Sequence, residues 1–433
     1  MKLKIAACVI PSELELRRTN SGSNDSPAEL DAFMVNINTS ALVYAAAKSL
    51  NSPTLPHIHE LDFGGWNKLF SLTFPDHSEM IARIPMTYSR SPRKLESEVA
   101  TMIFAREFCD IPAPRVFAWN SSDDNPVGAP YILMSKIKEV EPWEIWRKLD
   151  EERRLKLLDT LARHHARFSR PLPFQNIGSL YFAPSLADSS LADFQDPNNF
   201  CVGAYAHGPS CVKNRGPILH PESVPKVLKD FWSQYLQCEL DMVVARWGPA
   251  HDTIIDVGEG PPYDDDDHTL RELMEAAADI QTLIDRVALP DNPRILAPCL
   301  VMSDYAFRNI IIDPTTLDVV AFLDWEDVHI MPFILGTQLP EDIRTSGYSL
   351  PDPAESYSNE LPPPNDEEYL LCLEQLKNKR YSKFYAQRLA LHDPRFGGLW
   401  KLTEVSLMLQ YIVSHGWRSW ISEGWRTRSS RYS

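Results

Sequence analysis

The chain has 433 residues, a length that allows two or three domains or one large body with two lobes. Its 44% hydrophobic and 24% charged residues are ordinary for a globular chain, and no apolar run approaches the roughly 20 residues of a membrane-spanning helix. The formal charge of −16 argues against a nucleic-acid or anionic-membrane surface, which needs clustered positive charge, while it permits a cationic small-molecule substrate.

Residues 1–30 predict a flexible leader, because the stretch RTNSGSNDSPAELD is polar and rich in turn-forming residues. The opening MKLKIAACVI resembles a weak secretory signal, but Pro11, Glu13 and Glu15 follow at once and no cleavage site stands out. The seven cysteines are widely spread and form no CxxC pair, which favours reduced thiols. We therefore expect a cytoplasmic protein. The start lacks the Arg-rich character of a mitochondrial presequence, but a mitochondrial location stays open.

The segment 31–138 predicts a small antiparallel sheet that carries a helix. The expected strands, each a short apolar run beside turn residues, are 58–61, 68–73, 79–84 and 131–134. Between the third and fourth of them, residues 94–108 repeat apolar side chains at helical spacing, and prolines then end the pattern. A short linker near 135–142 follows. We expect residues 31–138 to form one lobe.

The segment 139–425 predicts a larger and mainly helical lobe. Residues 151–168 form an amphipathic helix, and Thr269 with Glu272 is a capping box that opens another. A hairpin pairs 310–312 with 319–323, and helices resume from about 366 to 424. Residues 183–268 and 333–365 show little regular pattern, and we expect them to line the pocket of a small-molecule substrate.

Three oxygen-bearing side chains flank that hairpin, in the stretches SDYAFRNIIID and FLDWE. Asn309 and Asp324 stand at its two ends, so adjacent strands can bring them to one divalent ion. Asp304 lies five residues before Asn309, where it can face a substrate hydroxyl instead. Phosphoryl transfer needs Mg²⁺ on oxygen ligands, a cation on the phosphates and a group that orients the hydroxyl. The alternative is that these residues only close turns, as Asp and Asn commonly do.

The pattern D-x4-N, then apolar residues and Asp, then a strand ending in DWE resembles the aminoglycoside phosphotransferase and choline kinase-like family. Upstream stretches match the family in order: FGGWNKLF at the glycine turn, MIARIP at the next strand, ESEVATM on the helix and YILMSK before the linker. The match runs from about residue 60 to 340. The phrases SEVATM, RIP and IGSLYF resemble the fungal-type branch. The resemblance implies a protein-kinase-like α+β fold with two lobes.

The resemblance also implies a function: transfer of the γ-phosphoryl group of Mg²⁺-ATP to a hydroxyl of a small molecule. Asp304 would be the catalytic base, and Asn309 and Asp324 the Mg²⁺ ligands. Arg83 would hold phosphate oxygens where most kinases use Lys, with Glu98 as its carboxylate partner. The remaining nucleotide-binding positions implied by the matched motifs are Phe63, Gly64, Gly65, Asn67, Met134 and Lys136.

Departures from the family pattern keep other readings open. Met302 stands where the family has a supporting His, and Tyr305 replaces a more usual Leu. A pseudokinase that keeps the fold as a nucleotide-binding or scaffold module is therefore the alternative, and an interaction protein without nucleotide is a third reading. His164 and His165 lie inside an amphipathic helix, where a structural role is expected. The sequence identifies neither the acceptor nor the oligomeric state.

Overall fold

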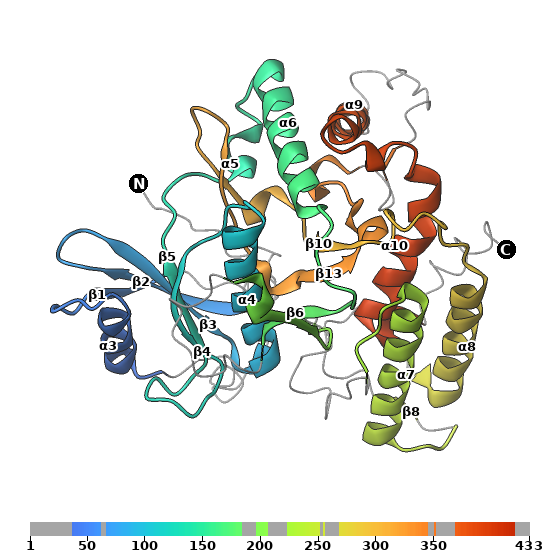
Figure 1. The fold of residues 1–433 in the computed structure, drawn as a ribbon, viewed down its shortest axis with the longest axis horizontal. Coiled ribbons are helices and arrows are strands. Elements are labelled where there is room, and N and C mark those ends of the chain that lie inside the picture. The colour runs from blue at the N-terminus through green and yellow to red at the C-terminus, as the bar shows by residue number, and fades with distance from the viewer. Residues whose placement is uncertain are drawn as a thin grey trace.

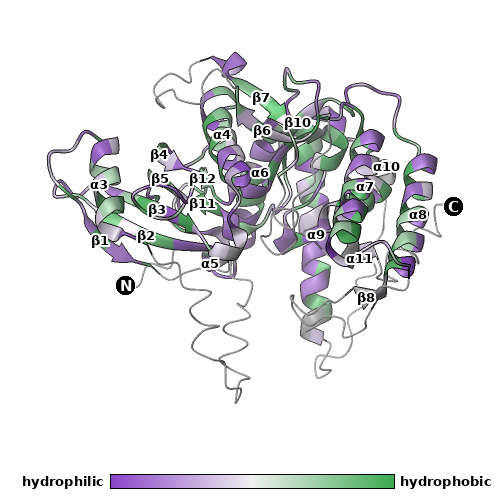
Figure 2. Ribbon diagram, turned by 90° about the horizontal axis from the view of Figure 1, so that it is seen from below, coloured by the Kyte–Doolittle hydropathy of each residue, from purple (hydrophilic) through white to green (hydrophobic). Residues whose placement is uncertain are grey.

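The computed structural model describes residues 37–61, 66–183, 196–206, 223–251, 254–255, 268–344, 350–351 and 369–420. A small sheet with two helices forms one side of the molecule, and a larger helical part forms the other (Figure 1). Helices α7, α8 and α10 gather at the end farthest from the sheet (Figures 1 and 2). The expected division into a sheet lobe and a helical lobe is present.

The small lobe is built on a five-stranded antiparallel sheet with the strand order β1-β2-β3-β5-β4. Its strands are β1 (His57–Glu60), β2 (Asn67–Thr73), β3 (Glu79–Pro85), β4 (Val116–Asn120) and β5 (Tyr131–Ser135), and its helices are α3 (Thr39–Ser49) and α4 (Pro92–Phe108). Four of these strands and α4 were predicted. Helix α3 and strand β4 were not.

Alternation along β3 separates the core of the small lobe from the site. Met80, Ala82 and Ile84 are buried in one cluster with Leu42 of α3. Because successive side chains of a strand point to opposite faces, Arg83 lies on the other face, toward α4. Helix α4 in turn packs its apolar residues into the core of the large lobe. It therefore lies between the two parts and can carry side chains to a site that both of them build.

The large lobe contains most of the helices. They are α5 (Pro142–Trp146), α6 (Glu151–Phe168), α7 (Leu228–Trp247), α8 (Leu270–Arg286), α9 (Tyr369–His392), α10 (Trp400–His415) and α11 (Trp417–Trp420). Figure 2 shows them with green and purple residues side by side, as expected of helices that bury one face. The capping box of α8 forms as predicted, with the Thr269 side chain accepting from the backbone N–H of Glu272.

Antiparallel strand pairs of the large lobe place the predicted site segments next to each other. The paired strands of the large lobe are β10 (Pro298–Met302) with β13 (Val328–Pro332), β11 (Ile310–Ile312) with β12 (Val319–Phe322), β6 (Ser179–Phe182) with β7 (Phe200–Gly203), and β8 (Ile254–Ile255) with β9 (His268–Thr269). The Ser303 N–H donates to the Asp327 carbonyl at 3.2 Å, and the Leu323 N–H donates to the Asn309 carbonyl at 2.7 Å. The loops 303–309 and 323–327 are thus joined at both ends.

The segment between the lobes has no regular structure from Lys136 to Glu139. Val140 then pairs with Ile312, their backbones exchanging hydrogen bonds of 3.2 and 2.8 Å. The chain is therefore fastened to the hairpin of the large lobe as soon as it leaves the linker.

Candidate functional site

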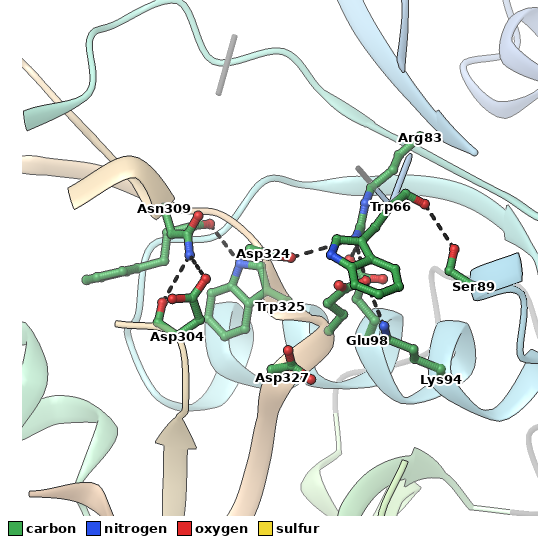
Figure 3. A network of polar contacts seen from close by, with 12 residues as sticks. Trp66, Arg83, Ser89, Lys94, Glu98, Asp304, Asn309, Asp324, Trp325 and Asp327 are labelled. Carbon is green, nitrogen blue, oxygen red and sulfur yellow. Dashed lines mark hydrogen bonds and ion pairs between the residues drawn. The ribbon is translucent and has the colours of Figure 1, made fainter. Parts of the chain in front are cut away.

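Asp304 and Asn309 face each other across the loop that follows β10 (Figure 3). The Asn309 side-chain N–H₂ donates to Asp304 Oδ2 at 2.8 Å and to the Asp304 carbonyl at 3.0 Å. Asn309 itself ends a single 3-10 turn and is buried. Because its amide nitrogen is used on Asp304, the amide oxygen is the atom that Asn309 can offer to a cation.

Arg308 holds the other oxygen of Asp304. Its guanidinium donates to Asp304 Oδ1 at 2.6 Å and to Glu341 Oε2 at 2.6 Å. The Asp304 carboxylate is therefore held on both oxygens in a fixed orientation, while its side chain stays 29% exposed. A base must be both oriented and reachable, and this carboxylate meets both conditions. Arg308 was not predicted as a site residue. Its position directly before Asn309 in the sequence was the signal that could have identified it.

Asp324 follows β12 in a left-handed backbone conformation, with φ of 56° and ψ of 61°. A residue other than glycine adopts this conformation at an energetic cost, and such positions gather at functional sites. The Leu323-to-Asn309 hydrogen bond sets Asp324 beside the Asp304–Asn309 pair, and Figure 3 shows it between that pair and Arg83. The structure thus brings the three predicted oxygen donors into one region.

The charge around Asp324 is unbalanced toward the negative. Burial, followed by the neighbouring carboxylate of Glu326, raises the pKa of Asp324 to about 7, and the Arg83 guanidinium offsets this only in part. Asp327 and Asp304 act in the same direction as Glu326. A divalent cation beside Asp324 would supply the missing positive charge and favour the ionised carboxylate.

The donor set fits Mg²⁺. Mg²⁺ is bound through one or two carboxylates and keeps its other positions for water and phosphate oxygens. The Asp324 carboxylate and the Asn309 amide oxygen would hold it in this way. Among the described residues no group of three or more His, Cys, Asp or Glu side chains is placed to hold a metal ion by itself.

Arg83 lies at the meeting point of the two lobes. Its guanidinium forms an ion pair with Glu98 of α4, the partner that the sequence predicted. The same guanidinium donates to Glu326 Oε2 at 2.8 Å and lies 3.7 Å from Asp324 Oδ1. Its position is therefore fixed by acids from the helix and from the loop after β12.

Lys94 and Glu326 are site residues that the sequence analysis did not assign. The Lys94 ammonium lies 3.2 Å from Glu326 Oε2 and 5.8 Å from the centre of the Trp66 ring, and its side chain is buried. Burial opposes its charge, but the carboxylates of Glu326 and Asp327 hold its pKa above the ordinary value. The available signal was spacing, because Lys94 and Glu98 share one face of a helix at i and i+4.

The remaining predicted nucleotide-binding residues have mixed placements. Phe63, Gly64 and Gly65 lie outside the described residues. Asn67 opens β2 opposite Pro85, and Met134 on β5 lies opposite Ile81.

Lys136 lies away from Arg83. Its ammonium is 2.7 Å from Glu79 Oε1 and 3.2 Å from Ser71 Oγ. Glu79 begins β3 four residues before Arg83, which corresponds to roughly 13 Å along a strand. The structure therefore gives Lys136 a local partner at the far end of β3 from the Arg83 cluster, and its role toward a nucleotide stays a prediction.

Removing Arg83 is expected to destabilise the protein strongly. The side chains of Arg83, Glu98 and Glu326 are only 10%, 8% and 11% exposed, so Arg83→Met removes the ion pair of buried Glu98 and leaves Lys94 as the cation beside Glu326. The free energy of unfolding, measured by urea at pH 7, should fall by about 3–5 kcal/mol. The matched control is Arg90→Met, because its partner Asp123 is 63% exposed and the loss should stay below about 1 kcal/mol. Equal losses in the two variants would contradict the account.

None of the helices among the described residues is long and apolar enough to cross a membrane.

Comparison with known proteins shows partial similarities. No family model matches the chain. A subtelomeric hrmA-associated cluster protein of Aspergillus fumigatus is 35% identical over 132 residues, which are 30% of this chain and 26% of that protein. Altered inheritance of mitochondria protein 9, mitochondrial, of Lachancea thermotolerans is 23% identical over 354 residues, 72% of this chain and 54% of that protein. The matched part of the chain therefore spans about a quarter and about half of the length of these relatives.

The similar solved structures include small-molecule kinases. Plasmodium vivax ethanolamine kinase has a TM-score of 0.44 at 10% identity, with 100% of this chain and 91% of that chain covered. An aminoglycoside phosphotransferase of Streptomyces rimosus has a TM-score of 0.41 at 13% identity, with 88% of this chain and 100% of that chain covered. The chain has, by its own elements, the predicted α+β fold of a small antiparallel-sheet lobe and a larger, mainly helical lobe.

Proposed function

We propose that this protein is a Mg²⁺- and ATP-dependent phosphotransferase that moves the γ-phosphoryl group to a hydroxyl of a small molecule. The observation that carries the proposal is the grouping of Asp304, Asn309 and Asp324 beside the buried cations Arg83 and Lys94. The proposed division is a leader of residues 1–30, a nucleotide-binding lobe of 31–138 and a catalytic and acceptor-binding lobe of 139–425.

Each group in the site has a part in this chemistry. Phosphoryl transfer depends on positioning and on electrostatic stabilisation more than on covalent participation of the protein. Mg²⁺, when bound by Asn309 and Asp324, neutralises charge on the phosphate oxygens. Arg83 and Lys94 provide cations on the side of the small lobe, and their partner acids hold them in place before a nucleotide arrives.

Asp304 is the proposed catalytic base. Its carboxylate orients the acceptor hydroxyl and takes its proton as the phosphoryl group is transferred. The bonds from Arg308 and Asn309 keep the carboxylate in a single orientation, which is what an acid–base group needs to act on a hydroxyl at a defined place.

The proposed acceptor class is a small hydroxylated molecule, and the formal charge of −16 permits a cationic one. Much of the segments 183–268 and 333–365, which we propose to line the acceptor pocket, lies outside the described residues.

The second candidate function is a nucleotide-binding scaffold without turnover, and Met302 in place of the family's supporting His favours it. Cytoplasm remains the proposed compartment. The alternative compartment is the mitochondrion, because the word mitochondrial is part of the name of the Lachancea thermotolerans relative. A place in the fungal-type branch is likewise a proposal, supported by relatives from Aspergillus fumigatus and Lachancea thermotolerans.

Thermal melting together with ATP consumption separates these candidates. A phosphotransferase is expected to gain about 2.7 kcal/mol of stability at Mg²⁺-ATP of 100 times Kd, and to consume ATP with at least one acceptor in a panel of hydroxylated small molecules. ATP without Mg²⁺ is the control and should give a smaller gain. Stabilisation without consumption across the panel would favour the scaffold. Absence of any stabilisation would contradict both candidates and leave the interaction protein.

A further inference from the structure

The segment that carries Asp304 is fastened to the helices beneath it by a buried hydroxyl. Tyr305, the next residue, is 6% exposed, and its hydroxyl donates to the Leu161 carbonyl of α6 at 3.1 Å. Its backbone carbonyl also accepts from the Glu341 N–H at 2.9 Å. The position of Asp304 along the chain is thus tied to α6 through the side chain of its neighbour.

A chain of hydrogen bonds continues from Tyr305 to a second helix. The Tyr385 hydroxyl of α9 lies 3.3 Å from the Tyr305 hydroxyl and 3.0 Å from His165 Nδ1, and His165 Nε2 lies 2.6 Å from the Gly336 carbonyl. His165 and Tyr385 are both buried. The two contacts of the Tyr305 hydroxyl therefore reach α6 and α9, which pack against each other.

Each tyrosine hydroxyl has one proton to donate. Tyr305 donates its proton to the Leu161 carbonyl, and Tyr385 donates its proton to the Tyr305 oxygen. His165 lies at the end of this chain, with Nδ1 beside the Tyr385 hydroxyl. The two donated protons link α9 to Tyr305 and Tyr305 to α6.

Apolar packing by itself leaves room beside Tyr305. A cavity of about 20 Å³ lies between the α6 side and β10, and its lining includes His165, Met302, Tyr305 and Gly336. The Tyr305 ring packs against His165 and Phe322, and beside the cavity its hydroxyl bonds add directional contacts to this packing.

We propose that Tyr305, Tyr385 and His165 form a positioning chain that holds the segment 303–309, and with it Asp304, in the geometry needed for phosphoryl transfer. The inference rests on the proposed function for its catalytic part. None of the three side chains touches the reacting atoms. They act by tying the loop to α6 and α9, and a misplacement of about 1 Å at a catalytic group can cost roughly 10²-fold in rate.

The test uses Tyr305→Phe and Tyr385→Phe, which remove one oxygen each, in the full-length protein. Tyr381→Phe is the matched control: Tyr381 lies one turn before Tyr385 on α9, is 3% exposed where Tyr385 is fully buried, and donates to Glu151 of α6 at 2.7 Å, outside the positioning chain. We expect kcat to fall about tenfold or more in the two chain variants, with the KM for Mg²⁺-ATP and the stabilisation by Mg²⁺-ATP unchanged. The control should keep the wild-type kcat.

Hydrogen exchange gives a readout that does not depend on activity. Amides of residues 303–309 should exchange several-fold faster in Tyr305→Phe and Tyr385→Phe than in the wild type, and at the wild-type rate in Tyr381→Phe. If residues 303–309 exchanged at the wild-type rate in all three variants, the positioning chain would be overturned. If the wild type consumed no ATP while the exchange pattern appeared as expected, the anchoring would stand and the proposed function would fail. Faster exchange with unchanged kcat would overturn the catalytic part.

Discussion

Asp304→Asn is expected to lower turnover by roughly 10²–10⁴-fold, the typical worth of a positioned acid–base group, while leaving the affinity for Mg²⁺-ATP near the wild-type value. The substitution keeps the size of the side chain and an oxygen that can accept from Arg308 or Asn309, so the loop keeps most of its contacts. What is lost is a carboxylate able to take the acceptor's proton. The effect should therefore appear in kcat, measured at saturating ATP with the acceptor found in the panel.

The control for this substitution is Asp313→Asn on the tip of the hairpin β11–β12. Asp313 Oδ1 accepts from the backbone N–H groups of Thr315 and Thr316 at 2.7 and 2.9 Å, so it holds a turn and faces no other site residue. Its variant should turn over at the wild-type rate. Unchanged turnover in Asp304→Asn would remove Asp304 from the role of base, whatever the other residues do.

Asp324→Ala is expected to abolish Mg²⁺-dependent nucleotide binding and, at the same time, to change how the stability of the ligand-free protein depends on pH. The first effect follows because Asp324 supplies the carboxylate of the proposed metal site. A calorimetric titration with ATP should show Mg²⁺-dependent heat for the wild type and none for the variant. Equal affinities in the two proteins would contradict the assignment.

The second effect follows from the pKa of about 7. In the unfolded chain an Asp has a pKa of about 3.9, so the folded state binds the proton more tightly. Ionisation then favours the unfolded chain, and the wild type loses stability as pH rises from about 4 to about 7. Three pKa units correspond to at most about 4 kcal/mol. Urea unfolding at pH 5 and pH 8 should therefore show a smaller loss on the alkaline side for Asp324→Ala than for the wild type.

The Asp313→Asn variant serves again as the control, because turn hydrogen bonds from the backbone lower the pKa of Asp313 instead of raising it. Its stability should follow the wild type between pH 5 and pH 8. If Asp324→Ala also followed the wild type, the carboxyl of Asp324 would not be the strained ionisable group in this site.

Elements with a strong local period were predictable from the sequence. Helix α6 begins and ends where its apolar repeat does, and the capping box of α8 identifies the residue at which that helix begins. The hairpin that carries the site was also predictable, because Asp313 and the residues after it form a turn between two short apolar runs. These features depend on neighbours in the chain, so composition and spacing are enough to find them.

Elements that depend on distant partners were not predictable in the same way. The apolar positions of α3 include several alanines, and its buried face forms only within a cluster that also contains Phe70 and Leu72 of the sheet. Helix α7 lies within a stretch that showed little pattern, and its buried face includes the charged Glu239. The contacts of Glu326 with Arg83 and Lys94 join residues far apart in sequence, so no local pattern indicates them.

In the proposed site Asn309 and Asp324 share one divalent ion under the phosphates of a nucleotide. Crystals grown with Mn²⁺ and a non-hydrolysable ATP analogue test it most directly, because Mn²⁺ is located by its anomalous scattering. We expect an anomalous peak within ligand distance of the Asn309 amide oxygen, an Asp324 carboxylate oxygen and the analogue's phosphates, with Asp304 facing the terminal phosphate. A bound analogue with its metal held by other residues, or with no metal between Asn309 and Asp324, would contradict it.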